Sequence, residues 1–284
     1  MPLLHIDKVG GRGDAPRGAS PIRSAGVKLV AVIPTYNEAG TLGALIDGLV
    51  AHCPDACELH VLVVDDASPD GTADIAAAAA RRWPGRVQLL SRPAKQGLAL
   101  AYVAGFARAL ADGADYVLQM DADGSHDPAA VPSMLAALDR ADVVIGSRYA
   151  AGDGRDSRDG YYRRTISRLA NRTVVRFLSP LPTSDPTSGF RLWRRDALLR
   201  IDPMRQVRAR AYGFQVEMAV LAARAGCRFA EVPIHFGDRR AGRSKMTPYV
   251  QLRTTCEIVV LPLLHRQTAS QGVVPVRIES DRTR

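Results

Sequence analysis

Aromatic residues are scarce, at 6% of the 284 residues, and no stretch of the chain alternates basic with aromatic side chains. This scarcity argues against a platform on which nucleic-acid bases would stack. The formal net charge of +9 still favours anionic partners, such as nucleotide-sugar phosphates or an anionic membrane face. Hydrophobic residues make up 46% of the chain, which is sufficient for a large core.

Long hydrophobic runs are also missing. The longest one near the C-terminus extends from Ile258 to Leu264, which is too short to span a bilayer. The first residues lack the apolar core of a signal peptide. The four cysteines show no spacing typical of a disulfide framework, which favours a reducing compartment. We therefore expect a cytoplasmic protein without a transmembrane segment, either soluble or peripheral at the membrane face.

One group of residues has the composition of a zinc site, with two histidines and two cysteines: His52, Cys53, Cys57 and His60. The surrounding pattern places them across the end of a helix and the start of a strand. We therefore do not expect them to converge on one metal ion.

Strand and helix patterns alternate through the first half of the chain. Continuous apolar strands are expected at residues 27–33, 59–64, 87–90, 116–120 and 143–146, and helices at 41–52, 72–82, 97–111 and 129–138. The second half is less regular, with helices expected at 161–178, 212–225 and 246–264 and strands at 189–193 and 228–232. The alternation indicates an α/β fold with a mostly parallel central sheet flanked by helices.

Two aspartates follow the strand expected at 116–120. Asp121 and Asp123 lie two residues apart, so both carboxylates can bind one divalent cation. Hard oxygen ligands suit Mg²⁺ or Mn²⁺, ions that often join protein carboxylates to a substrate diphosphate. The alternative is that both are turn residues, since Asp and Gly are ordinary turn formers.

Further acidic residues follow the first two strands. Ligands of parallel sheets gather beyond the carboxyl ends of the strands, so residues 34–38 and the Asp65–Asp66 pair are expected on the same rim as Asp121. Clustered carboxylates are costly unless cations or donors compensate them. An acid at Asp65 suits a nucleobase edge or ribose hydroxyls. The alternative for the first loop is that Asn37 caps the next helix.

At these positions the sequence resembles the family 2 glycosyltransferases, which have the GT-A fold. The resemblance covers about residues 27–250. Its first motifs are IPTYNE at 33–38, VVDDASPDGT at 63–72, the Gly97 region and MDADGSHDP at 120–128. Further motifs are similar to those of the polyprenol-phosphate (dolichol-phosphate) mannose synthases: VIGSRY at 144–149, Arg163 to Arg168, SDPTSGF at 184–190 and GDRRAGRSKM at 237–246.

The resemblance implies a metal-dependent inverting mannosyltransferase that moves mannose from GDP-mannose to a polyprenyl monophosphate. The residues it implies for the donor nucleotide-sugar are Pro34, Tyr36, Glu38, Asp65, Asp121 and Lys245. Those implied for Mg²⁺ or Mn²⁺ are Asp121, Asp123 and Ser125. Ser125 stands where many members have Gln, and it still offers an oxygen, directly or through water.

Basic residues complete the implied site. The resemblance assigns the acceptor phosphate to Arg148, Arg163 and Ser167, and the catalytic set to Asp123, Arg148, Arg163 and Arg239. Arginine forks bind phosphate with two parallel hydrogen bonds. Residues 239–245 resemble a mobile loop that closes over donor and metal. Other arginines read as a solvated cationic surface: Arg194, Arg195, Arg205 and Arg208.

Together these patterns predict a disordered arm at residues 1–26, a GT-A catalytic domain at 27–250, a helix at 251–268 that could lie in the membrane interface, and a flexible tail at 269–284. His126 is expected to support its loop rather than to act as a base. The role of Asp185 stays open between orienting the acceptor and orienting its own loop.

Two other functions remain open at this point. One keeps the fold and uses a UDP-sugar, glucose or an N-acetylhexosamine, with a lipid-phosphate or soluble acceptor. The other is a basic binding or scaffold protein without catalysis, against which the intact Asp121, Asp123 and Arg239 argue.

Overall fold

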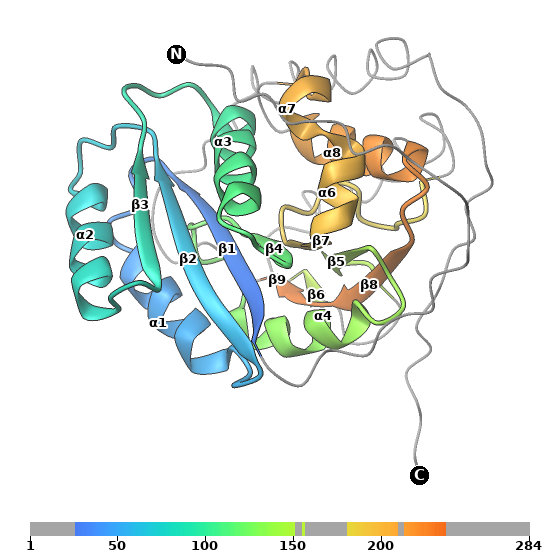
Figure 1. Ribbon diagram of the computed structural model, residues 1–284, viewed down its shortest axis with the longest axis horizontal. Helices are drawn as coiled ribbons and strands as arrows, with labels where there is room; N and C mark the ends of the chain where they lie inside the picture. Colours follow the sequence, from blue (N-terminus) through green and yellow to red (C-terminus); the bar gives the residue numbers. More distant parts are fainter. Residues whose placement is uncertain (1–25, 151–154, 157–180, 210–212, 237–284) are drawn as a thin grey trace.

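The computed structural model describes residues 26–150, 155–156, 181–209 and 213–236 (Figure 1). The predicted arm at residues 1–26, except Gly26 itself, lies outside this part. The helices predicted at 161–178 and 246–264 also lie outside it, as do the segments at 251–268 and 269–284.

A seven-stranded sheet forms the centre of the fold, in the order β3-β2-β1-β4-β7-β5-β8. The strands are β1 (Val27–Thr35), β2 (Cys57–Asp65), β3 (Val87–Ser91), β4 (Tyr116–Gln119), β5 (Val143–Ser147), β7 (Arg191–Arg194) and β8 (Phe229–Pro233). A second, two-stranded sheet pairs β6 (Arg155–Asp156) with β9 (His235–Phe236).

The large sheet is mostly parallel, as predicted. Strand β7 is antiparallel to both of its neighbours, β4 and β5, whereas the other pairs in this sheet are parallel. The sequence predicted a strand near β7 but gave no sign of its direction.

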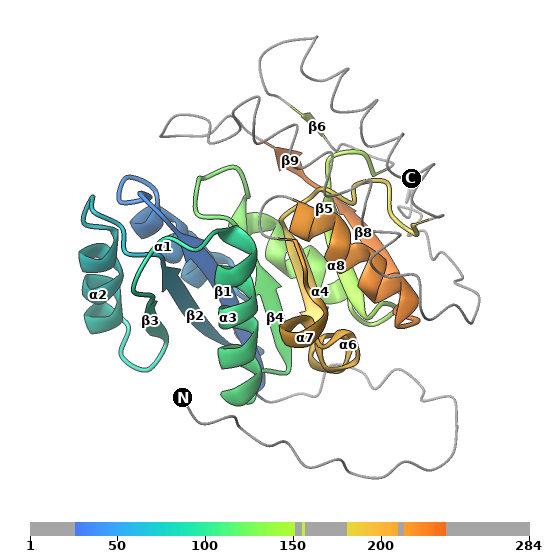
Figure 2. The same cartoon turned by 90° about the horizontal axis from the view of Figure 1, so that it is seen from above.

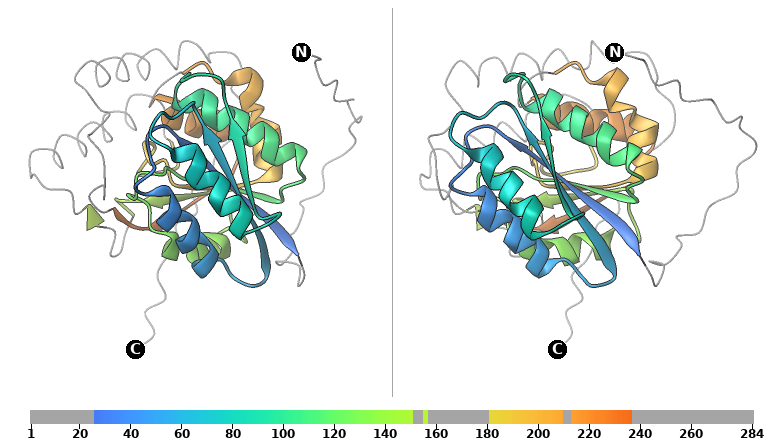
Figure 3. Two further views of the ribbon diagram at one scale, coloured as in Figure 1. Left: turned by 90° about the vertical axis from the view of Figure 1, so that its left-hand side faces the viewer. Right: turned by 60° about the vertical axis from the view of Figure 1, so that its left-hand side comes forward.

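Helices cover both faces of the sheet (Figures 2 and 3). One face carries α1 (Leu42–His52), α2 (Thr72–Arg82), the short 3₁₀ helix η1 (Pro128–Ala130) and α4 (Val131–Ala137). The other carries α3 (Leu98–Ala111), α6 (Arg195–Ile201), α7 (Pro203–Gln206) and α8 (Gly213–Arg224). The sequence predicted α2 at its observed bounds, predicted η1 and α4 as one helix, and missed α6 and α7.

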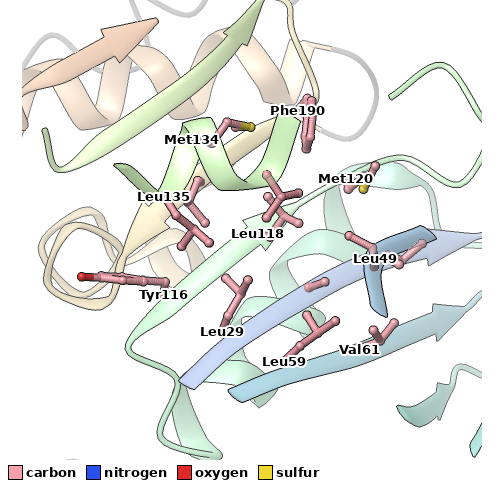
Figure 4. Packing of buried hydrophobic residues seen from close by; sticks show 14 of the residues in the cluster. Leu29, Leu49, Leu59, Val61, Tyr116, Leu118, Met120, Met134, Leu135 and Phe190 are labelled. Atoms are coloured by element: carbon pink, nitrogen blue, oxygen red, sulfur yellow. The ribbon is translucent and has the colours of Figure 1, made fainter. Parts of the chain in front are cut away.

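Two apolar layers hold the sheet between the helices. Along β1, Leu29 and Ile33 face the α1 side while Val30 and Val32 face the α3 side, because successive side chains point to opposite faces. Figure 4 shows the first layer, where Leu118 of β4 lies near Met134 and Leu135 of α4. A strand buried on both faces must be apolar at every position, which explains the continuous runs in the sequence.

The second layer contains stacked aromatic side chains. Tyr102 of α3 lies parallel to Phe214 of α8, with 5.5 Å between the ring centroids and 6° between the ring planes. Phe106 packs against both rings. Helix α3 also approaches the sheet closely at Gly105, where a Cβ atom would overlap Val32. Helix α3 is therefore held tightly between the sheet and α8.

Within the part of the chain that the structure describes, no helix is both long enough and apolar enough to cross a bilayer.

Candidate active site

Strands β1, β2 and β4 run parallel, so the loops that follow them leave the sheet at the same edge. Thr35 pairs with Asp65 at the ends of β1 and β2, and Gln119 at the end of β4 pairs with Val32 of β1. This register brings together the predicted donor residues near Pro34, Asp65 and Asp121.

The Asp65 carboxylate is buried between the first two loops, with 2% of the residue exposed. Its Oδ1 accepts hydrogen bonds from Thr35 Oγ1 at 2.8 Å and Ser68 Oγ at 2.6 Å, and its Oδ2 accepts one from Ser68 N at 2.9 Å. Asp65 thus joins the ends of β1 and β2. Its predicted contact with the nucleoside stays a prediction.

The loop after β1 presents Tyr36 and Glu38. The Lys95 ammonium lies 3.8 Å from the centroid of the Tyr36 ring, a cation–π contact. Glu38 N donates to Thr72 Oγ1 at 2.9 Å, which fixes this loop against the start of α2. The alternative left open for this loop, that Asn37 caps the next helix, is wrong, because α1 begins at Leu42 and Asn37 has a φ of 59°.

Asp66 anchors the start of α3. Its Oδ1 accepts from Arg92 Nη1 at 2.7 Å, and its Oδ2 accepts from the backbone N–H groups of Gln96 at 3.0 Å and Gly97 at 3.3 Å. Both members of the ion pair are nearly buried. Asp66 therefore accepts hydrogen bonds from backbone N–H groups just before α3, and Arg92 balances its negative charge.

Asp121 lies at the end of β4 against α3. The Tyr102 hydroxyl donates to Asp121 Oδ1 at 2.6 Å. Burial, and then the negative charge of Asp121, raise the pKa of Tyr102 well above its usual value, so the phenol keeps its proton at neutral pH. The backbone of Gly189 lies on another side, where a Cβ atom would stand 2.8 Å from Asp121 Oδ2.

Asp123 is oriented by Ser125. Ser125 N donates to Asp123 Oδ1 at 3.1 Å, and the Ser125 hydroxyl donates to the same oxygen. Ser125 is buried while Asp123 is half-buried. The structure therefore shows Ser125 supporting Asp123, and its predicted contact with a metal stays a prediction.

The carboxylates of Asp121 and Asp123 fit a hard divalent cation whose remaining ligands come from a substrate. Among residues 26–150, 155–156, 181–209 and 213–236, no group of three or more His, Cys, Asp or Glu side chains could hold a metal. Asp121 and Asp123 supply two carboxylates, and Mg²⁺ commonly takes one or two carboxylates and completes its shell with phosphate oxygens and water.

His126 supports the turn that carries both aspartates. The ring is buried and stacks on Phe190, with 5.0 Å between centroids and 13° between planes. Its Nδ1 accepts a hydrogen bond from Asp121 N at 3.1 Å, so this nitrogen carries no proton. Burial lowers the pKa of His126, which keeps the ring neutral. These features favour the supporting role predicted for His126.

Arg148, after β5, forms a nearly buried ion pair with Asp185. Its Nε donates to Asp185 Oδ2 at 2.7 Å and its Nη2 to Asp185 Oδ1 at 2.6 Å, and Nη2 also reaches Thr187 Oγ1 at 2.7 Å. Burial opposes ionisation of Asp185, but the charge and hydrogen bonds of Arg148 outweigh it and lower the pKa of Asp185. Asp185 thereby orients the guanidinium predicted for the acceptor phosphate.

Arg191 of β7 is a second buried cation near this loop. Its Nε donates to Ser188 O at 2.9 Å and its Nη2 to Pro186 O at 2.6 Å, while Nη1 has no hydrogen-bond partner. Burial lowers the pKa of Arg191 to about 10. The side chain fixes the shape of the segment that passes behind Asp121.

Other predicted basic residues have separate outcomes. Arg163, Ser167, Arg239 and Lys245 lie outside the described residues, so their roles stay predictions. Arg205 and Arg208 are exposed, as expected. For Arg194 and Arg195 the expectation of a solvated surface is wrong, because their guanidinium groups donate to the backbone carbonyls at Leu138, Ala141, Leu110 and Ala114.

Sequence reasoning placed Asp66 on the rim but missed several residues that shape the site, namely Arg92, Tyr102, Gly189 and Arg191. Tyr102 stands at a helical apolar position and reads as ordinary core. Its polar partner is 19 residues away, so no local spacing could have revealed the contact. The role of Asp185 in orienting Arg148 was likewise hidden, because Arg148 follows β5 and lies 37 residues before Asp185.

The mostly parallel sheet with helices on both faces is the GT-A fold found in solved glycosyltransferases. Two solved structures share the fold, each at 20% identity. Glucosyl-3-phosphoglycerate synthase from Mycobacterium tuberculosis, in complex with Mn²⁺, UDP and glucosyl-3-phosphoglycerate, has a TM-score of 0.61 over 89% of this chain and 85% of its own. Mannosyl-3-phosphoglycerate synthase from Rubrobacter xylanophilus has a TM-score of 0.60 over 88% of this chain and 79% of its own.

Sequence comparison identifies the family. The profile of glycosyl transferase family 2 matches residues 30–201, and the chain belongs to this family. Undecaprenyl-phosphate mannosyltransferase from Micrococcus luteus is 42% identical over 78% of this chain and 88% of its own length. Polyprenol monophosphomannose synthase from Mycolicibacterium smegmatis is 41% identical over 84% of this chain and 86% of its own length.

Proposed function

We propose that this protein transfers mannose from GDP-mannose to a polyprenyl monophosphate and forms polyprenyl-phosphate mannose. The strongest support is the likeness, above 40% identity over most of the chain, to two proteins named as a mannosyltransferase and a monophosphomannose synthase acting on such lipids. The carboxylate pair at Asp121 and Asp123, on the same rim as the loop of Tyr36, is consistent with a nucleoside diphosphate sugar as donor.

In the proposed reaction an oxygen of the acceptor phosphate attacks the anomeric carbon of mannose from the side opposite the diphosphate. The bond to the diphosphate oxygen breaks, the bond to the acceptor oxygen forms, and the configuration inverts. A phosphate monoester has a second pKa of about 6, so at neutral pH it attacks without a strong general base. His126 is buried and its Nδ1 is occupied by the bond from Asp121 N, which is consistent with a site that uses no histidine as a base.

The protein's part in this reaction is to hold and to orient. Asp121 and Asp123 would hold Mg²⁺ or Mn²⁺, which when bound neutralises charge developing on the departing diphosphate. Ser125 orients Asp123, and Asp185 orients Arg148 toward its proposed contact with the acceptor phosphate. Arg163, Ser167, Arg239 and Lys245 complete the proposed set, with Arg239 and Lys245 acting from a closing loop.

The proposal includes the place of reaction. The chain would meet its lipid acceptor as a peripheral protein at the cytoplasmic face of the membrane, assisted by its net charge of +9. Sedimentation with vesicles of anionic phospholipid, compared with vesicles of phosphatidylcholine alone, measures this. Equal recovery in the supernatant with both vesicle types would contradict it.

The decisive experiment incubates the purified chain and Mn²⁺ with radiolabelled GDP-mannose and a short polyprenyl phosphate, followed by extraction into organic solvent. Label in the organic phase is expected with GDP-mannose and not with UDP-glucose or UDP-N-acetylglucosamine. If label reached the organic phase only with a UDP-sugar, the proposed donor would be wrong and the donor would be that UDP-sugar. Thermal stabilisation by GDP but not by UDP, each with Mn²⁺, is the matching binding result.

Two aspartates of the same loop provide matched variants. Asp123→Ala is expected to abolish transfer without unfolding the protein. Asp127→Ala should keep transfer near the wild-type rate, because Asp127 is exposed and, among the described residues, its side chain accepts a hydrogen bond from Ala129 N alone, at the start of η1. Undiminished turnover in Asp123→Ala would refute the assignment of the site.

A further inference from the structure

The side chain that holds Asp121 comes from α3, outside the loop that carries the carboxylate pair. The Tyr102 hydroxyl donates to Asp121 Oδ1 at 2.6 Å, a short bond of the charge-assisted kind. Tyr102 lies outside every family motif identified in the sequence. Tyr102 therefore has a role in the site that the proposed ligand set does not cover.

The position of this hydroxyl is fixed from several directions. The Tyr102 ring is fully buried, is stacked on Phe214, and packs at a tilt of 31° against Phe106. The start of α3 is anchored by the bonds of Asp66 to the N–H groups of Gln96 and Gly97. Since neither the ring nor the helix can shift freely, the hydroxyl determines where Asp121 Oδ1 lies.

The same carboxylate is confined on its other oxygen. The Gly189 backbone comes so close that a Cβ atom there would stand 2.8 Å from Asp121 Oδ2 and 3.2 Å from Gln215 Nε2. Gln215 is itself held by a hydrogen bond from Gln119 Nε2, and Gln119 is the last residue of β4. The Asp121 carboxylate thus has little room to rotate.

We propose that Tyr102 is a positioning residue that fixes Asp121 and makes the site select small octahedral cations over Ca²⁺. With Oδ1 committed to the hydroxyl, chelation of one ion by both oxygens of Asp121 is disfavoured. Mg²⁺ and Mn²⁺ tolerate single-oxygen carboxylate ligands in near-octahedral shells, whereas Ca²⁺ prefers larger, flexible shells with chelating carboxylates. The inference rests on the proposed function, because it requires Asp121 to hold a divalent cation.

The test compares Tyr102→Phe, which removes the hydroxyl and keeps the ring, with Tyr116→Phe. Tyr116 is a nearly buried tyrosine at the other end of β4, packed under Arg194. Binding of Mn²⁺ to the full chain with GDP is followed by electron paramagnetic resonance, and Ca²⁺ affinity is measured by competition. No turnover is needed for this readout.

Tyr102→Phe is expected to weaken Mn²⁺ binding about tenfold, the usual scale for a residue that orients a metal ligand. Its Ca²⁺ affinity should change less than its Mn²⁺ affinity, so that the preference for Mn²⁺ falls, while Tyr116→Phe matches the wild type. Equal weakening of both ions, or unchanged Mn²⁺ affinity in Tyr102→Phe, would overturn the inference alone. A wild-type chain that binds no Mn²⁺ would overturn the proposed metal site together with it.

Discussion

Gly189→Ala offers a sharp test of how the site is built, because the substitution crowds the Asp121 carboxylate directly and its effect on activity can be compared with its effect on stability. Gly189→Ala would add one methyl group at a position where no space exists. The added Cβ would stand 2.8 Å from Asp121 Oδ2, 3.2 Å from Gln215 Nε2 and 3.4 Å from Asp121 Cγ. These atoms belong to a carboxylate and an amide that other hydrogen bonds already hold, so they cannot move away cheaply.

The expected cost has two parts. Overpacking of a buried position costs about 1 to 3 kcal/mol of unfolding free energy, which lowers the melting temperature by several degrees. The effect on transfer should be larger, because displacement of a catalytic group by about 1 Å can reduce turnover about a hundredfold. We therefore expect Gly189→Ala to fold and to transfer at least about tenfold more slowly than the wild type.

The assay pairs urea denaturation with extraction of labelled polyprenyl-phosphate mannose. Gly43→Ala is the matched control, since a Cβ at Gly43 in α1 would meet only Ile75 Cγ2, at 3.8 Å. That variant should keep full activity and gain about 0.5 to 1 kcal/mol from helix propensity. A Gly189→Ala protein with wild-type turnover would refute the view that the Gly189 backbone confines Asp121.

Two further predictions concern buried carboxylates. Asp185→Asn should destabilise the protein by about 3 to 5 kcal/mol at pH 7, because it leaves the Arg148 guanidinium nearly buried without its charge partner. The pKa of Asp185 is lowered in the folded protein, so its contribution is complete above the unfolded pKa of about 3.9 and is lost as the pH falls through the folded value. The difference in unfolding free energy between wild type and variant should therefore be constant above about pH 5 and shrink below about pH 4, and a difference that grows in acid would contradict this. Asp66→Asn should speed hydrogen exchange at the first turn of α3 and lower the unfolding free energy by about 1 to 3 kcal/mol. Asp47→Asn, which breaks an exposed pair with Arg82, is the control and should lower it by less than about 1 kcal/mol. Equal losses in the two variants would contradict the anchoring role of Asp66.

The first half of the fold could be predicted because its signals are local. The central residues of β1, β2 and β4 are mostly apolar on both faces, which is typical of strands covered by helices on both sides. The observed ends differ from the predicted ones by no more than two residues in these strands. Parallel order then placed the acidic loops on one rim without any knowledge of side-chain contacts.

The second half could not be predicted as well, because its determinants are long-range. Strand β7 has four residues, and its direction depends on partners in β4 and β5 that lie far away in the sequence. Within the site, the sequence identified carboxylates but not their partners. Asp65 read as a nucleoside contact, and only the structure shows its bonds to Thr35 and Ser68.

The late position of β7 in the chain has a consequence for biosynthesis. In the large sheet β5 is bordered by β7 and β8, and β7 also covers one side of β4. During synthesis, β4 and β5 are made well before β7 (Arg191–Arg194). Until β7 is made, the edge of β4 and the edge of β5 that β7 later pairs with have no partner strand. Uncovered edges invite pairing with other chains. Synthesis stalled before Arg191 should therefore yield aggregation-prone nascent chains, while stalling beyond β8 should not.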